Sequence, residues 1–225
     1  VERKREILES RTNSTRLLVE GLRKTSHTIK TVVTASAIGY YGFKNREEVF
    51  TEDSEAGKDF LANVTLRWER EADAFDELGM RAVKIRIGIV LSKKGGALEE
   101  IARPVKYFVG APLGAGSQFI SWIHLDDLCS IFVKAVEDSG MHGAYNGVAP
   151  EPLTNRALTK AIARTLKRPL LLPPIPSFVL KLLLGEMADL VLQGSKVSAN
   201  KVIQAGYKFR FPDINHALHD LLRHD

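Results

Sequence analysis

Short apolar strands alternate with amphipathic helices over the first 150 residues. Strand patterns cover residues 31–36, 82–91, 119–123 and 144–148, and helical periodicity covers residues 57–78, 95–105 and 126–137. Strands joined by crossover helices pair in parallel within one sheet, with helices on both faces. The alternation therefore predicts an α/β fold with a doubly wound parallel sheet.

The pattern changes after Pro150. Helical spacing dominates residues 154–166, 177–192 and 214–222, and Pro-rich segments join them. We therefore expect the strands to stop there and a small, mostly helical lobe to follow the sheet. A further helix is expected at the start of the chain, over residues 2–24, with Gly21 weakening its last turn.

The composition excludes several classes of protein and partner. The 225 residues are 44% hydrophobic and 26% charged, as in an ordinary globular protein. The net charge of +5 is dispersed among acids, so no nucleic-acid partner is expected. The longest apolar runs are too short to cross a bilayer, and no membrane partner is expected.

Neither the single cysteine nor the acidic stretch after His124 indicates a metal site. Cys129 is alone, so it forms neither an intrachain disulfide nor a metal cluster, and its pattern is that of a helix interior. Asp126 or Asp127 is expected to cap the helix that begins there. We predict no metal.

The strand at residues 31–36 ends in a cluster of hydroxyl groups. Ser36 closes the strand, and Tyr40 and Tyr41 follow in the next loop. Ligands of parallel α/β sheets bind outside the carboxyl ends of the strands. These three residues are therefore the catalytic candidates, the alternative being that the serine bonds to backbone and that the tyrosines only pack.

Other polar residues lie inside or at the ends of the predicted strands. Arg86 interrupts an apolar strand and must have a partner, either an acidic side chain or a phosphate of a cofactor or substrate. Gln118, Trp122 and His124 surround a short strand and are candidates for a substrate pocket, and Asn146 could also reach a ligand.

The order of motifs resembles a known family. The motifs are Ala-Ser-Ala-Ile-Gly-Tyr-Tyr-Gly at 35–42, Trp-Glu at 68–69, Arg-Ile-Gly-Ile-Val-Leu at 86–91, Gly-Gly-Ala at 95–97, Ser-Trp-Ile-His-Leu-Asp-Asp at 121–127 and Asn-Gly-Val-Ala-Pro at 146–150. Together they resemble the extended short-chain dehydrogenase/reductase superfamily, and within it the atypical branch of NAD-dependent epimerase/dehydratase proteins. The resemblance implies a Rossmann-like domain at residues 1–92 and 118–148, and a substrate-binding helical lobe at residues 93–117 and 149–225.

The resemblance also implies a catalytic trio that this sequence keeps only in part. In active members a Ser, a Tyr and a Lys move the proton of the substrate hydroxyl. Ser36 matches the serine, but the positions of the Tyr and Lys hold Leu61 and Thr65. A Tyr and a Lys with the right spacing occur at Tyr40 and Lys44, in the loop after the strand, where helical register does not bring them together.

The same resemblance implies a nicotinamide cofactor. Family members hold its pyrophosphate on a Gly-rich turn after their first strand, and no such motif occurs in this sequence. Binding of NADP or NAD is thus expected only together with such a turn, which the resemblance places upstream of Val1. The basic balance favours NADP. The candidates for cofactor contact are Arg11, Ala35, Arg86 and Gly88.

We therefore expect an NAD(P)-binding protein with redox or epimerase chemistry on a small polar substrate. The alternative is a non-enzymatic, cofactor-occupied regulator or scaffold, which the loss of the Tyr and Lys favours. The resemblance also implies homodimers built through residues 2–24 and 57–78. The compartment stays open between the cytoplasm of a bacterium and an organelle of a eukaryote.

Overall fold

The centre of the molecule is a parallel sheet of three strands, β1 (Thr31–Ala37), β3 (Arg81–Ile87) and β7 (Gly143–Gly147), in the order β1-β3-β7. The computed structural model describes residues 2–42, 48–185 and 188–223. In the register of the sheet Ser36 lies opposite Arg86, which lies opposite Asn146. Three polar residues therefore form one row across the carboxyl end of the sheet.

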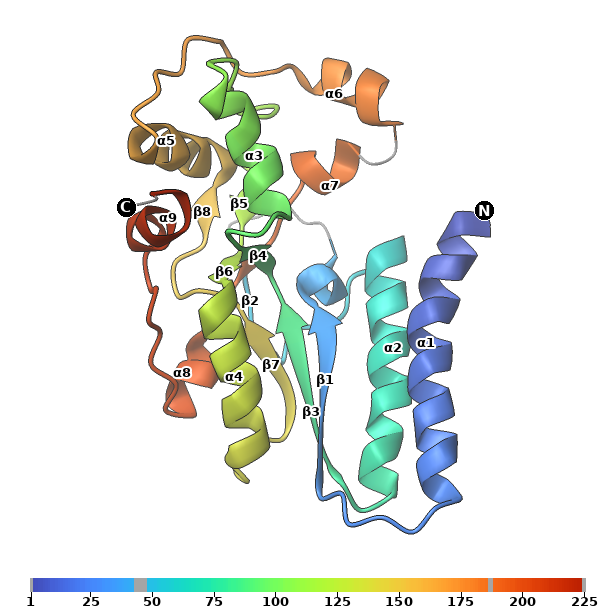
Figure 1. Cartoon of the computed structure of the whole chain (residues 1–225). Helices are drawn as coiled ribbons and strands as arrows, with labels where there is room; N and C mark the ends of the chain where they lie inside the picture. The colour runs from blue at the N-terminus through green and yellow to red at the C-terminus, as the bar shows by residue number, and fades with distance from the viewer. Residues whose placement is uncertain (1, 43–47, 186–187, 224–225) are drawn as a thin grey trace.

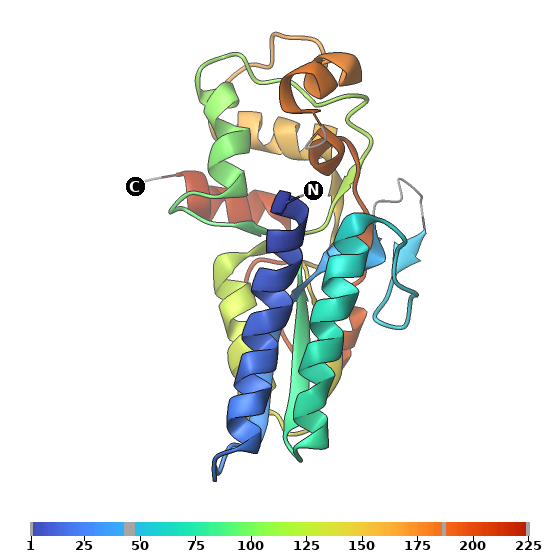
Figure 2. The same cartoon turned by 90° about the vertical axis from the view of Figure 1, so that its right-hand side faces the viewer.

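Helices cover both faces of this sheet (Figures 1 and 2). Helices α1 (Glu2–Arg23) and α2 (Phe60–Glu77) lie side by side on one face, and α4 (Leu125–Glu137) lies on the other. Val19 of α1 and Phe75 of α2 share an apolar cluster with Ala82 of β3. This arrangement confirms the prediction of a doubly wound parallel sheet.

The strand expected at residues 82–91 divides at Gly88. Its first part is β3, and its second part is β4 (Ile89–Leu91), which pairs with β6 (Trp122–His124). The Gly88 amide donates to the carbonyl of Gly147, and the next amide, of Ile89, donates to the carbonyl of Ser121. A Cβ at Gly88 would lie 2.4 Å from the Ser121 oxygen, so only glycine fits this crossing between two sheets.

The C-terminal half contains more strand than expected. Strand β8 (Leu153–Thr154) pairs antiparallel with β5 (Phe119–Ile120), and β9 (Lys196–Val197) pairs in parallel with β2 (Val49–Phe50). The expectation that strands stop after Pro150 is therefore wrong. Segments of two residues are too short to show an alternating pattern.

The remaining helices form a lobe above the carboxyl end of the sheet (Figure 1). They are α3 (Ala97–Lys106), α5 (Asn155–Thr165), α6 (Ser177–Leu184), α7 (Ala188–Leu192) and α9 (Ile214–Leu222), while α8 (Asn200–Gln204) lies lower, beside β7. The single helix expected at residues 177–192 ends at Gly185, which has a φ of 57°, and residues 186 and 187 lie outside the described ones.

The predicted division between residues 1–92 with 118–148 and residues 93–117 with 149–225 stays a prediction. Among the helices described, none is long and apolar enough to cross a membrane.

Candidate functional site

The polar row at the end of the sheet is almost completely buried. The exposed fractions of Ser36, Arg86 and Asn146 are 3%, 4% and 0%. Buried polar groups must be hydrogen-bonded, and a buried charge must be paired. The partners of this row therefore decide what it can do.

Glu69 of α2 is the partner of both Arg86 and Ser36. Nε and Nη2 of Arg86 donate to its two carboxylate oxygens at 2.9 and 2.8 Å, and the Ser36 hydroxyl donates to Oε1 at 2.5 Å. Burial works against the charge of Arg86, but the hydrogen bonds and charge interactions with Glu69 and Tyr41 together outweigh it and hold its pKa above the usual value. The acidic-partner alternative is the one that the structure shows. The cofactor-phosphate role for Arg86 is corrected accordingly, because the guanidinium is already paired.

The two neighbouring tyrosines have opposite environments. Tyr41 is 0% exposed, its hydroxyl donates to Oδ1 of Asn146 at 2.7 Å and accepts from Nη1 of Arg86 at 3.0 Å, and burial raises its pKa to about 12. Tyr41 is a structural residue in this network, and its predicted catalytic role is corrected because no substrate can reach the phenol.

Tyr40 is half-buried and lies against the other side of the network. The Arg86 guanidinium carbon stands 3.4 Å from the centre of its ring, which is a close cation–π contact. Within the described part of the chain, its hydroxyl has no hydrogen-bond partner. Of the three hydroxyls predicted at this strand end, Tyr40 alone therefore has an unengaged hydrogen.

The loop that carries the tyrosines is fixed by contacts from distant segments. It forms the short helix η1 (Ile38–Tyr41), whose Tyr40 carbonyl accepts from the amide of Gly57 at 2.8 Å. The hydroxyl of Ser195 donates to the carbonyl of Gly42 at 2.7 Å. Glu52 accepts from the Asn146 amide at 2.8 Å through Oε1. Sequence reasoning missed Glu52, Glu69 and Ser195 as network members, and only the position of Glu69 four residues after Thr65 on a helix face could have indicated one of them.

The positions that the family resemblance assigns to the Tyr and Lys do lie beside this loop. A Cβ at Gly39 would be 3.6 Å from Oγ1 of Thr65 and 3.7 Å from Cβ of Leu61. The Thr65 hydroxyl donates to the Leu61 carbonyl at 2.8 Å. Neither side chain can act as an acid or base near neutral pH. Lys44, the alternative partner of Tyr40, lies outside the described residues.

Two of the substrate-pocket candidates hold the fold together instead. Nε2 of Gln118 donates to the carbonyls of Leu113 and Val191, at 3.1 and 2.8 Å. Trp122 is completely buried in the core beneath the lobe, and its indole N–H donates to the carbonyl of Glu151 at 3.0 Å. The pocket-lining role is corrected for both, because their polar atoms are used internally.

The candidates for cofactor contact are dispersed. Arg11 is exposed on α1, where its guanidinium carbon lies 5.8 Å from the centre of the Trp68 ring. Ala35 is half-buried in β1, one residue before Ser36. Gly88 is required by the strand crossing. The cofactor contacts of Arg11, Ala35 and Gly88 remain predictions.

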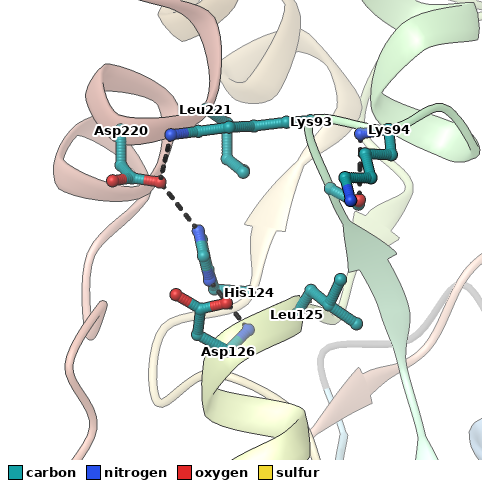
Figure 3. Close-up of a pocket in the computed structure, with 8 residues that line it drawn as sticks. Lys93, Lys94, His124, Leu125, Asp126, Asp220 and Leu221 are labelled. Carbon is teal, nitrogen blue, oxygen red and sulfur yellow. Dashed lines mark hydrogen bonds and ion pairs between the residues drawn. The ribbon is translucent and has the colours of Figure 1, made fainter.

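His124 lines a cavity of about 340 Å³ that is formed by other elements (Figure 3). The residues that line it come from the segment after β4, the end of β6, the start of α4 and the last turn of α9. None of the described lining residues belongs to β1, η1 or α2. Its Nδ1 accepts from the amide of Asp126 at 3.1 Å, and its ring stacks on Phe211 with 3.8 Å between centres. The cap of α4 is therefore His124, which corrects the expectation for Asp126 or Asp127.

Asp127 instead fastens the chain that leads to α9. Its carboxylate accepts from the Tyr207 hydroxyl at 2.8 Å and from the amides of Arg210 and Phe211 at 2.8 and 2.9 Å. Across the described ranges, no group of three or more His, Cys, Asp or Glu residues could hold a metal ion.

The sheet, its crossover helices and the residues at its carboxyl end define a Rossmann-like fold of the short-chain dehydrogenase/reductase type. Over 97% of this chain, the crystal structure of human epimerase family protein SDR39U1 (isoform 2) with NADPH superposes with a TM-score of 0.88, at 32% identity and covering 74% of that protein. Residues 175–221 match a family model described as a domain of unknown function, DUF1731.

Curated relatives give the same assignment. Epimerase family protein YfhF of Bacillus subtilis is 38% identical over 97% of this chain and 72% of its own length. The chloroplastic SDR39U1 homologue of Arabidopsis thaliana is 40% identical over 85% of this chain, which spans only 54% of that relative. The chain belongs to the epimerase family proteins of the SDR39U1 and YfhF type.

Proposed function

We propose that this protein binds NADP(H) and carries out a redox or epimerase-type reaction on a small polar substrate. The observation that carries the proposal is the similarity to the human relative, which was solved with NADPH and matches 97% of this chain. The bound cofactor would supply the hydride. The residues of this chain that are candidates to contact it are Arg11, Ala35 and Gly88, whereas Arg86 does not fit a phosphate because Glu69 neutralises it.

Tyr40 is the residue that we assign to the substrate oxygen. Ser36 gives its only hydroxyl hydrogen to Glu69, so it can accept a hydrogen bond from a ligand but cannot polarise a carbonyl. Tyr41 is enclosed by Asn146 and Arg86. The Tyr40 phenol keeps its hydrogen available, and the stacked guanidinium of Arg86 holds the ring in place.

The test is NADPH consumption by the full-length natural protein with a panel of carbonyl compounds and nucleotide sugars. Tyr40→Phe should lower turnover by at least about a hundredfold, because it removes the proton donor. Tyr41→Phe is the matched control and should retain turnover. Equal activity of wild type and Tyr40→Phe would remove Tyr40 from the mechanism.

A second candidate function is a cofactor-occupied regulator without turnover. Leu61 and Thr65 favour it, because they stand where the resemblance requires a proton-transferring Tyr and Lys. Native mass spectrometry of the full-length protein decides between the two functions when combined with the substrate panel. Retained NADP(H) without turnover on any substrate supports the regulator, and failure to retain the nucleotide contradicts both functions.

A further inference from the structure

In the cavity beside His124, the carboxylate of Asp220 lies between the ammonium group of Lys93 and the imidazole of His124 (Figure 3). Oδ2 of Asp220, on α9, lies 3.3 Å from Nζ of Lys93 and 3.4 Å from Nε2 of His124. Both distances are long for hydrogen bonds of charged groups. Oδ2 of Asp220 therefore lies where an oxygen of a bound anion would lie, and its contacts with Lys93 and His124 are long.

The tautomer of His124 follows from its capping role. Nδ1 accepts from the Asp126 amide and thus carries no hydrogen, so the neutral ring carries its hydrogen on Nε2. The side chain is 2% exposed, and in the described part of the chain Nε2 makes no hydrogen bond, because the nearby Asp220 oxygen is not aligned for one. A buried donor without an acceptor destabilises the folded state. An additional acceptor oxygen in the cavity would be stabilised by this N–H group.

The charges around the cavity leave room for one more anion. Lys94 lines the cavity next to Lys93, and no acid in the described residues pairs with it. Asp126 has its own cation, Arg210, at 3.6 Å. Lys93 is therefore paired with Asp220, whereas Lys94 adds a positive charge that no acid among the described residues offsets. The amino end of α4, a helix of 13 residues, adds a positive dipole end on the same side.

We propose that this cavity binds a small oxyanion, a carboxylate or phosphate group, which accepts from Nε2 of His124 and takes the place of Asp220 beside Lys93 and Lys94. Leu125 and Leu221 also line the cavity and offer apolar surface to a short carbon body of the ligand. No residue of the proposed NADP(H) site takes part, so this site is independent of the proposed function.

The experiment is a titration of the full-length protein, labelled with ¹⁵N, with inorganic phosphate and separately with acetate, while the Nε2–H resonance of His124 is followed by NMR. We expect a saturable shift with one or both ions. Asp220→Asn should tighten binding, because it removes the competing carboxylate while keeping the shape. Lys93→Gln should weaken it by about tenfold, the effect of one lost charge-assisted contact. Lys106→Gln, at the exposed end of α3, is the matched control and should change nothing.

The two ions separate the two ligand chemistries. A shift with phosphate alone assigns a phosphate ligand, and a shift with acetate alone assigns a carboxylate. An unshifted His124 resonance with both ions would overturn the proposal. Weaker ion binding by Asp220→Asn than by wild type would also overturn it. Equal losses of ion affinity in Lys93→Gln and Lys106→Gln would indicate an adventitious ion only and would overturn it as well.

Discussion

Arg86 is the residue on which the polar network at the end of the sheet depends. It is paired through two hydrogen bonds with Glu69, donates to Tyr41 and stacks on Tyr40. A planar guanidinium can make all of these contacts at once, and a lysine cannot. The network therefore fixes both tyrosines through a single side chain.

Arg86→Leu should lower the free energy of unfolding by about 3–5 kcal/mol, because it leaves the Glu69 carboxylate buried without its cation. Urea denaturation measures the effect. The matched control is Arg23→Leu, which breaks the exposed pair with Glu77 and should cost about 0–1 kcal/mol. Similar losses in the two variants would show that the buried pair contributes no more than a surface pair.

His124 should make stability depend on pH. Burial lowers its pKa below the usual 6.5, so as the pH falls below about 6.5 the unfolded chain binds this proton more readily than the folded chain does. The free energy of unfolding should thus fall between pH 7 and pH 5. His124→Asn keeps a helix-capping oxygen and should flatten that fall, measured by urea denaturation at each pH. An unchanged slope in His124→Asn would contradict the assignment.

The sequence predicted where the polar network lies, but it predicted few of the contacts within the network. A charge inside an apolar strand required a partner, so the choice for Arg86 between an acid and a phosphate could be stated in advance. Only the position of Glu69 on the helix face of Thr65 pointed to it, since the contact with Arg86 forms only after α2 packs on the sheet. Tyr40 and Tyr41 are adjacent, and the turn of η1 decides which of them is buried, a detail that no periodicity reveals.

At the scale of elements, the crossing at Gly88 connects the sheet to the lobe. The backbone of β3 continues into β4 without a loop. β3 pairs with β1 and β7 in the central sheet, and β4 pairs with β6 in a separate sheet. The apolar pattern of residues 82–91 predicted one strand, because both parts are apolar and the pattern does not change where the partner changes. Residues 177–192 were predicted as one helix for a similar reason, since the apolar pattern outweighed the glycine at 185.

Gly88→Ala should destabilise the protein by at least about 1–3 kcal/mol, because the added Cβ would lie 2.4 Å from the Ser121 oxygen and 2.8 Å from Cγ1 of Val148. The melting temperature measures the loss. Gly39→Ala is the control, since its Cβ would meet only ordinary contacts at 3.6 Å or more, and it should stay within about 1 kcal/mol of wild type. Equal melting temperatures for Gly88→Ala and wild type would show that the crossing tolerates a side chain.

At the scale of the whole molecule, Asp127 attaches the end of the chain to the sheet-bearing half. Its carboxylate receives two backbone amides and one hydroxyl from residues 207–211, and α9 follows directly. A carboxylate accepts all three, whereas an amide group presents N–H to at least one of these donors.

Asp127→Asn should therefore accelerate amide hydrogen exchange at Arg210 and Phe211 by about tenfold or more, since a hydrogen bond to a charged acceptor contributes about 1.5–3 kcal/mol. The amides of β1 should keep their protection. Glu137→Gln, at the exposed end of α4, should leave both regions unchanged. Protection at Arg210 and Phe211 that survives in Asp127→Asn would mean that packing alone holds this segment.

The strand that passes through Gly88 couples the unfolding of the two sheets that it joins. Residues 81–91 complete the central sheet and the small sheet of β4 and β6 together, so neither sheet can lose this strand while the other keeps it in place. The two halves are thus expected to melt cooperatively, giving one calorimetric peak whose van't Hoff and calorimetric enthalpies agree.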